Sequence, residues 1–208
     1  MKYEFVSDNV IKSDNFLPPD KIGFIYADLL NTRKHFGVPR WSGKNIDHQP
    51  RVEAFSQNCG NMDYWIDANN PENIDAPNIK DLHKYFFQHG LQLFIQESGR
   101  KTIYDMLYEY PLVWSIHVTA YNKGAYYNWH KDTEIFTFNL ILNQGNNLSG
   151  GDMLFMDDGK IITIPNQDNF MVVFPSYIDH AITEIKSKDG KDVPFPQQRF
   201  SIQYWVKL

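Results

Sequence analysis

From about Pro111 onward, the sequence alternates apolar and polar residues with a period of two, whereas the preceding region has the 3.6-residue period of helices. This switch constrains the fold more than any other feature. Period two predicts half-buried strands, and Gly, Asn and Asp turn signals separate seven such runs. The strands are expected at residues 113–121, 135–143, 152–156, 160–164, 169–175, 180–185 and 199–206. Short strands at this spacing are typical of a β-sandwich, a jelly roll or a barrel.

The region before residue 111 predicts helices. A Pro-Pro pair opens an apolar pattern that predicts a helix over residues 19–31. A second helical pattern covers residues 79–109, where Gly90 and Gly99 predict a break into two helices. Residues 40–78 have no regular pattern, so we expect a functional loop or lid there. The order of elements predicts an α+β, mainly β protein with its N-terminal helices packed on one sheet.

Composition excludes several classes of protein. The 208 residues are 42% hydrophobic and 15% aromatic, which suits one folded domain rather than a disordered chain. The formal net charge of −5 makes nucleic acid an unexpected partner. No apolar run approaches the length of a membrane span and the start of the sequence lacks a signal-peptide pattern, so we expect a cytoplasmic protein. The single cysteine, Cys59, excludes an intrachain disulfide and leaves His and carboxylate side chains to hold any metal.

Two histidines stand in a pattern that suits a metal ion. His130 and Asp132 are two residues apart in an extended segment, so their side chains point to the same side. His180 follows a strongly apolar predicted strand. Two imidazoles and one carboxylate can occupy one face of a six-coordinate metal and leave the other positions open, as in non-haem Fe(II) oxygenases. A His-x-Asp pair with a distant histidine also occurs by chance, so this pattern alone does not decide between a metal site and a structural role.

A second pair lies on the last predicted strand. Arg199 and Ser201 share one face, opposite Phe200 and Ile202. On an edge strand the arginine would simply point to solvent, but inside the protein it is costly unless a carboxylate meets it. Beside the histidine pattern, a buried co-substrate with a carboxylate is the better interpretation, because guanidinium binds a carboxylate through two parallel hydrogen bonds.

These patterns together resemble the Fe(II)- and 2-oxoglutarate-dependent dioxygenases, specifically the prolyl 4-hydroxylase-like group. The resemblance extends over most of the chain, and its anchors are Asp14-Asn15-Phe16-Leu17-Pro18, Tyr121-Asn122-Lys123-Gly124, His130-Lys131-Asp132, Leu140-Ile141-Leu142-Asn143, Gly150-Gly151-Asp152-Met153-Leu154-Phe155, Val173-Phe174-Pro175-Ser176, His180 and Arg199-Phe200-Ser201. It implies a double-stranded β-helix, or jelly roll, in a single domain over residues 1–208. The helical support region would cover about 1–110 and the jelly-roll core about 111–208.

The resemblance also implies roles for individual residues. The implied iron ligands are His130, Asp132 and His180. Arg199 would bind the C5 carboxylate of 2-oxoglutarate, with Ser201 and Tyr121 as helpers, and Tyr127 would line the same pocket or the substrate entrance. The implied reaction consumes 2-oxoglutarate and O₂, releases succinate and CO₂ and hydroxylates a C–H bond. A peptidyl proline is the favoured substrate, and ascorbate is an optional addition.

Two features depart from the family pattern. The segment between His180 and Arg199 is longer than usual, and residues 186–196 predict an extended hairpin loop with an Asp189-Gly190 turn. Ile141 stands where relatives often have a tyrosine that contacts 2-oxoglutarate. Residues 40–78 and 186–198 are the expected lids, and Trp41, Trp65, Trp129 and Phe136 are candidate substrate contacts that also suit a core role.

Three alternatives stay open at this point. The protein could hydroxylate a free amino acid or another small molecule instead of a peptide. It could be a non-catalytic jelly-roll binding protein with structural histidines. It could also be a different mononuclear metalloenzyme on a cupin-like barrel that uses no co-substrate, for which Arg199 is the discriminating residue.

Overall fold

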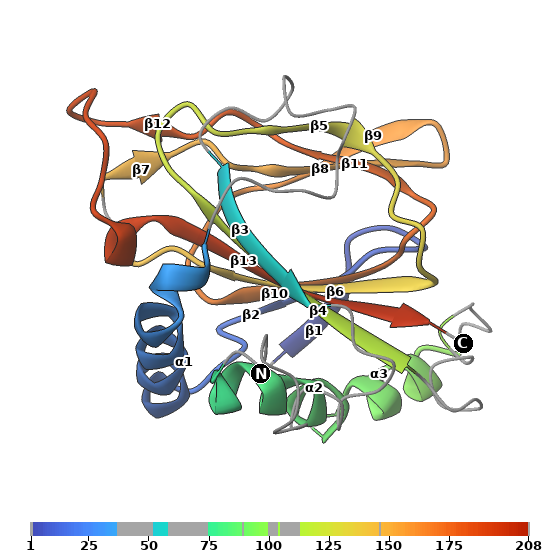
Figure 1. The fold of residues 1–208 in the computed structure, drawn as a ribbon. Coiled ribbons are helices and arrows are strands. Elements are labelled where there is room, and N and C mark those ends of the chain that lie inside the picture. The colour runs from blue at the N-terminus through green and yellow to red at the C-terminus, as the bar shows by residue number, and fades with distance from the viewer. Residues whose placement is uncertain are drawn as a thin grey trace.

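A computed structural model describes residues 2–36, 52–57, 75–88, 90–99, 104, 113–145 and 147–207. Its helices form one layer against a large β-sheet, and a smaller sheet lies on the other side of that sheet (Figure 1). The elements are β1 Lys2–Phe5, β2 Ile11–Asp14, α1 Pro19–Asn31, η1 Arg33–His35, β3 Val52–Gln57, α2 Pro77–Gln88, α3 Leu91–Glu97, β4 Val113–Tyr121, β5 Tyr127–His130, β6 Phe136–Leu142, β7 Leu148–Ser149, β8 Met153–Asp157, β9 Lys160–Ile164, β10 Phe170–Pro175, β11 Asp179–Ile182, β12 Lys186–Ser187, η5 Phe195–Gln197 and β13 Arg199–Lys207.

Three sheets account for the described strands, and their paired strands run antiparallel. The large sheet has the order β1-β2-β10-β6-β13-β4-β3, and the smaller one has the order β5-β11-β8-β9. Strands β12 and β7 form a two-stranded sheet. The long strand β13 lies inside the large sheet, between β4 and β6. The described chain is therefore mainly antiparallel β with few helices, as the sequence predicted at this level.

The period of two in β13 separates the two faces of the large sheet. Phe200, Ile202 and Tyr204 are buried in the core shared with the helices. The intervening residues, which include Arg199 and Ser201, are also buried but belong to the opposite face, toward the smaller sheet. Because both faces of β13 are covered, its polar side chains must find partners inside the protein.

A buried carboxylate joins the first two helices. Asp28 on α1 accepts hydrogen bonds from the backbone N–H of Ile79 and the side-chain amide of Asn78, both at 2.9 Å. These donors lie in the first turn of α2, whose N–H groups have no partner within the helix. Asp28 thus caps α2 from a neighbouring helix and fixes the layer that supports the large sheet.

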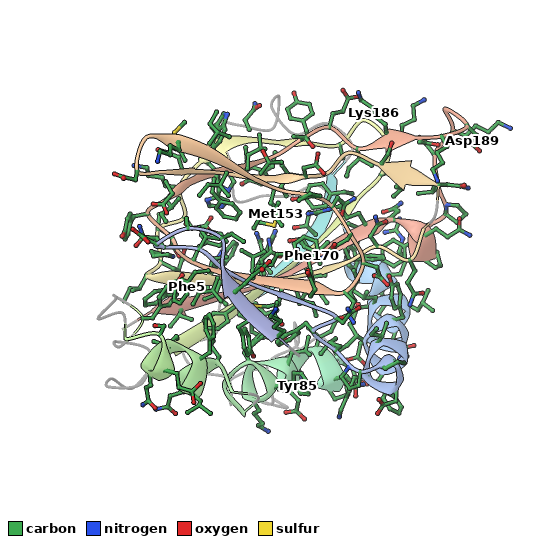
Figure 2. The ribbon with its side chains drawn as sticks, turned by 180° about the vertical axis from the view of Figure 1, so that it is seen from behind. Phe5, Tyr85, Met153, Phe170, Lys186 and Asp189 are labelled. Carbon is green, nitrogen blue, oxygen red and sulfur yellow. The ribbon has the colours of Figure 1, made fainter. Side chains whose placement is uncertain are left out.

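A second apolar cluster lies between the two sheets. Figure 2 shows two of its members, Met153 and Phe170, in the space between the layers. The other buried members are Val10, Ile141, Phe155, Ile164, Val172, Phe174 and Ile178. This cluster closes one side of the space between the sheets.

Most predicted elements are confirmed. Helix α1 and strands β4 and β9 have the predicted bounds, and α2 and α3 are separated at Gly90, whose φ is +87°. The predicted strands at 135–143, 152–156, 169–175, 180–185 and 199–206 are present with shifted ends. The sequence did not predict β1, β2, β3, β5, β7 or β12 as separate strands.

Two expectations need correction. Segment 40–78 was expected to be irregular, but Val52–Gln57 forms β3 at the edge of the large sheet, paired with β4; the rest of that segment up to residue 74 lies outside the described residues. The extended hairpin predicted at residues 186–196 is not formed, because Lys186–Ser187 at its start is strand β12, which pairs with β7. The predicted turn is present, and the Gly190 N–H donates to the Ser187 carbonyl at 3.1 Å.

Among the described residues, no helix is long and apolar enough to cross a membrane.

Candidate metal centre

Strand pairing brings the three predicted metal ligands together. His130 ends β5 and lies opposite His180 of the antiparallel neighbour β11. The two rings have centroids 4.1 Å apart, and Asp132 follows two residues after His130. One ligand atom from each of the three side chains lies within 4.8 Å of the others. Within the described part of the chain, no other group of His, Cys, Asp and Glu side chains meets this criterion.

The carboxylate of Asp132 lies close to both imidazoles. Its Oδ1 is 3.7 Å from Nε2 of His130, and its Oδ2 is 3.6 Å from Nε2 of His180. The pKa of His130 is lowered to about 4, first by burial and then by the nearby His180, against the opposing effect of Asp132. His130 is therefore a neutral imidazole at pH 7, which is the form that can bind a metal ion.

Backbone carbonyls orient both imidazoles. Nδ1 of His130 lies 2.8 Å from the carbonyl of Asn128, and Nδ1 of His180 lies 2.9 Å from the carbonyl of Ile178. Because a carbonyl can only accept, each ring in its neutral form carries its proton on Nδ1 and presents the Nε2 lone pair to the centre. Nε2 of His180 is buried and has no hydrogen-bond partner among the described residues. A buried nitrogen in this state is costly, and a metal ion bound there would satisfy it.

A buried guanidinium group lies on the large sheet. Arg199 has no exposed surface, and its Nε donates to Oδ1 of Asn166 at 3.3 Å. Within the described chain, Nη1 and Nη2 are buried without hydrogen-bond partners. Burial lowers the pKa of Arg199 to about 10, so the group stays positively charged at pH 7. A buried cation with two free N–H edges suits a carboxylate, which binds both nitrogens in one plane.

The predicted helper residues lie on the same inner face. Tyr121 is in register with Arg199 across β4 and β13, and the guanidinium carbon is 5.1 Å from the centroid of its ring. Burial raises the pKa of Tyr121 to about 12, so its phenol stays protonated at neutral pH. The ring of Tyr127 lies against His130, with centroids 3.9 Å apart. Tyr121 therefore accompanies the arginine and Tyr127 accompanies the metal ligands.

Ser201 is occupied within the protein. Its hydroxyl donates to Oδ1 of Asn139 at 2.7 Å, and the amide of Asn139 has a long contact of 3.9 Å to the sulfur of Met153. Ile141, which replaces the tyrosine of relatives, is in register with Ser201 and buried in the apolar cluster. Asn139 and Ser201 thus form a buried polar pair, with Ser201 two residues along β13 from Arg199.

The sequence patterns missed the residues that support the two ends of the site. Thr137 and Trp205 donate hydrogen bonds to Asp132, and Asn166 accepts one from Arg199. Trp205 has the same parity on its strand as Arg199, so the period of two could have indicated that it faces inward. Asn166 lies in a connection between strands, where no periodic pattern marks it.

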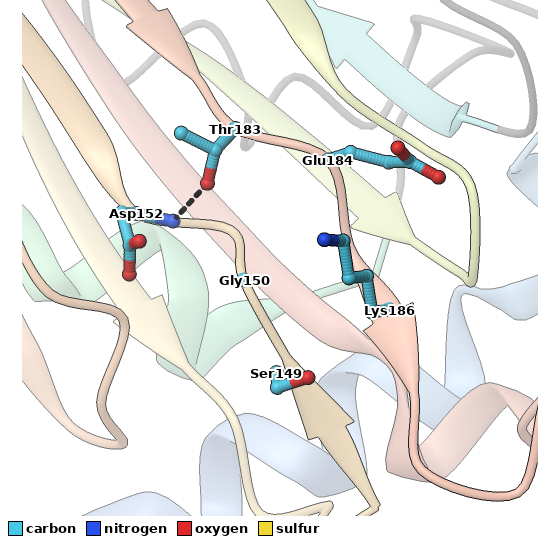
Figure 3. A pocket seen from close by; sticks show the side chains of 6 residues that line it. All are labelled: Ser149, Gly150, Asp152, Thr183, Glu184 and Lys186. Carbon is cyan, nitrogen blue, oxygen red and sulfur yellow. Dashed lines mark hydrogen bonds between the residues drawn. The ribbon is translucent and has the colours of Figure 1, made fainter.

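A surface hollow of about 430 Å³ lies between residues 149–152 and residues 183–186 (Figure 3). It is lined by Ser149, Gly150, Asp152, Thr183, Glu184 and Lys186, which include none of the predicted site residues. Asp152 in the wall of this hollow supports the site indirectly. Its Oδ1 accepts the backbone N–H of Asn166 at 2.8 Å, and Asn166 in turn accepts the hydrogen bond from Arg199. A Cβ atom on the adjacent Gly151 would lie 3.0 Å from Cδ of Arg199, so the arginine side chain passes close to this backbone. The hollow is therefore a neighbour of the site.

Comparisons with known proteins agree with this geometry. Residues 116–207 match the family model described as the 2OG-Fe(II) oxygenase superfamily. A Pseudomonas putida prolyl-4-hydroxylase superposes with a TM-score of 0.59 and 16% identity, over 96% of this chain and 92% of that one. A Trichoplax adhaerens prolyl hydroxylase, solved with a hypoxia inducible factor peptide fragment, superposes with a TM-score of 0.64 and 16% identity, over 97% of this chain and 84% of that one. A viral collagen prolyl hydroxylase from Paramecium Bursaria Chlorella virus-1 superposes with a TM-score of 0.54 and 14% identity, over 96% of each chain.

At these identities the structural likeness is one of fold, and a search of curated protein sequences finds no match. The fold brings together two histidines and one carboxylate that could hold a metal ion. Residues 116–207, which contain the triad and Arg199, match the 2OG-Fe(II) oxygenase superfamily, and this match supports a 2-oxoglutarate-dependent oxygenase, as the sequence predicted. The family match and the triad support Fe(II) as the cofactor and 2-oxoglutarate and O₂ as the co-substrates.

Proposed function

We propose that the protein hydroxylates a C–H bond of its substrate and converts 2-oxoglutarate to succinate and CO₂. One observation supports this more than any other. Nε2 of His180 and the Nη1 and Nη2 groups of Arg199 are buried without hydrogen-bond partners among the described residues, on elements of the two facing sheets. One suits a metal ion and the other a carboxylate, which are the two partners that a chelated 2-oxoglutarate requires.

Each end of the interior has a separate task in this proposal. The residues that would hold the iron are His130, Asp132 and His180. Arg199, fixed by Asn166, would bind the C5 carboxylate, with Tyr121 and Ser201 beside it and Tyr127 against the metal end. When bound, the iron supplies the oxidising power that C–H hydroxylation needs. The protein's contribution is to orient the ligands, to neutralise the distal carboxylate and to exclude water.

The proposed substrate is a peptide with a proline residue. This rests on the fold of prolyl hydroxylases, one of which was solved with a bound peptide fragment. Of the aromatic residues considered as substrate contacts, Trp129 is 44% exposed beside His130, whereas Phe136 is buried in the core on the helix side; Trp41 and Trp65 lie outside the described residues. Phe136 is therefore withdrawn as a candidate, and Trp129 is retained. A free amino acid or another small molecule is the alternative substrate.

We also infer that residues 1–208 form a single 2-oxoglutarate/Fe(II) dioxygenase domain with a double-stranded β-helix, or jelly roll. The two facing antiparallel sheets and the apolar cluster between them support this topology. The N-terminal part contributes β1, β2 and β3 to the large sheet as well as helices. The helical support region and the β core would therefore unfold together in one cooperative transition.

Purified protein incubated with Fe(II), 2-oxoglutarate, ascorbate and air should release succinate when the correct substrate is present. A panel of proline-containing peptides and free amino acids should identify a substrate whose mass increases by one oxygen atom, in equal amount with succinate. Omitting Fe(II) or 2-oxoglutarate provides the control. Succinate formation without any oxidised substrate across the panel would leave the substrate class unsupported, and absence of 2-oxoglutarate turnover with every member would contradict the proposed reaction.

A further inference from the structure

The two oxygens of the Asp132 carboxylate have different surroundings. Oδ2 accepts hydrogen bonds from the hydroxyl of Thr137 at 2.7 Å and from the indole N–H of Trp205 at 3.0 Å. Oδ1 accepts no hydrogen bond from the described part of the chain and lies 3.7 Å from Nε2 of His130. One oxygen is therefore held by the protein, while the other is available to a cation.

Strand register explains why both donors reach the same atom. Thr137 on β6 and Trp205 on β13 are directly opposite each other in the large sheet. Residues paired in this way have side chains on the same face, a few ångströms apart. The indole of Trp205 also stacks on His117, with centroids 5.0 Å apart and an interplanar angle of 14°. The N–H of Trp205 is thus aimed at Asp132 by packing as well as by its strand.

The direction of the hydrogen bonds can be assigned from their chemistry. Oγ of Thr137 is also 2.9 Å from Oγ of Ser176. An ionised carboxylate only accepts, so the single hydroxyl proton of Thr137 goes to Asp132, and Ser176 must donate to Thr137. The carbonyl of Ser176 in turn accepts the backbone N–H of Asp132 at 3.0 Å. Ser176 thereby fixes Asp132 through its backbone and supports the side-chain contact through Thr137.

We propose that Trp205 and Thr137 are positioning residues that keep Asp132 bound to the metal through Oδ1 alone. Their two hydrogen bonds occupy Oδ2, so the carboxylate does not close onto the metal with both oxygens. A carboxylate that binds through one oxygen takes one coordination position and leaves three open beside the two histidines. This inference rests on the proposed metal centre and deepens it, because those open positions are the ones that 2-oxoglutarate and O₂ require.

Titration with Co(II) alone tests the inference without depending on turnover. Trp205→Phe and Thr137→Val each remove one donor and keep most of the side-chain shape. Each should weaken Co(II) binding by about 10- to 100-fold, the usual effect of losing a partner of a metal ligand. Each should also change the visible absorption spectrum of bound Co(II), because the carboxylate can then bind with both oxygens. Thr137→Ser keeps the hydroxyl and should restore both the affinity and the spectrum.

Matched controls separate positioning from general damage. Trp129→Phe alters a 44% exposed tryptophan on β5, and Thr163→Val alters an exposed threonine on β9. Both should bind Co(II) as the unmodified protein does. Thermal unfolding of the metal-free variants shows whether each one folds, and Thr137→Val decides the matter if Trp205→Phe does not fold.

The outcomes distinguish this inference from the proposed function. Suppose that the original protein binds Co(II) tightly, and that Trp205→Phe and Thr137→Val both show the same Co(II) affinity and the same spectrum as the original protein. That result would overturn the positioning role alone. Failure of the original protein to bind Co(II) would instead contradict the metal centre itself. Weakened binding in Thr137→Ser as well as Thr137→Val would also count against the inference, since the serine retains the donor.

Discussion

Replacing Asp132 with alanine is expected to reduce succinate formation to the background level. The substitution removes the one anionic group of the triad, and it leaves the donors of Thr137 and Trp205 facing an empty space. The loss of metal affinity should exceed the roughly 100-fold effect of losing a partner of a ligand, because a ligand itself is lost. Metal affinity by calorimetry and succinate release by chromatography measure the two effects.

Asp179 offers a matched control for this experiment. It precedes His180 on β11, its side chain is 46% exposed, and it lies 3.5 Å from the ammonium group of Lys131. An exposed ion pair of this kind contributes little, so Asp179→Ala should keep both metal binding and turnover. Equal activity in the Asp132 and Asp179 variants would exclude Asp132 from the reaction.

Replacing Arg199 with methionine should have opposite effects on co-substrate binding and on stability. Removing one partner of a buried charged pair costs about 2–5 kcal/mol, which corresponds to roughly 30- to 5,000-fold weaker binding of 2-oxoglutarate. The metal-free protein should become more stable, by about 1–4 kcal/mol, because an unpaired buried cation is replaced by an apolar side chain of similar length. Calorimetry with 2-oxoglutarate and urea unfolding of metal-free protein measure the two changes.

The control and the partial rescue for Arg199 are available in the chain. Arg33 is exposed on η1 with its guanidinium over the ring of Phe195, so Arg33→Met should leave 2-oxoglutarate binding unchanged. Arg199→Lys keeps the charge but cannot form two parallel hydrogen bonds, and its affinity should lie between those of arginine and methionine. If Arg199→Met binds 2-oxoglutarate normally and retains activity, a metalloenzyme that uses no co-substrate becomes the better account.

Local periodicity was sufficient to predict much of this architecture. The alternation in β13 correctly separated Arg199 and Ser201 from Phe200 and Ile202, because the two faces of a strand follow from the backbone alone. The helix at residues 19–31 was equally accessible, since its proline start and apolar spacing are both local signals. The triad was predicted from the two-residue spacing of His130 and Asp132 together with the family resemblance.

Contacts between distant strands could not be predicted in the same way. The hydrogen bond from Trp205 to Asp132 depends on the pairing of β13 with β6 and on where the connection after β5 passes. The contact of Asn166 with Arg199 depends on a non-repetitive connection. Strand β3 was missed because its sequence lies among many polar and turn-forming residues, so no local pattern indicates a strand. It forms a strand by pairing with β4.

The central claim is that one interior space holds a metal at the triad and a dicarboxylate at Arg199. Calorimetric titration of 2-oxoglutarate, with Mn(II) in place of Fe(II) to prevent turnover, tests this claim most directly. The account predicts one 2-oxoglutarate per chain, with binding that requires both Mn(II) and Arg199. Binding of equal strength without Mn(II), or in the Arg199→Met variant, would contradict it.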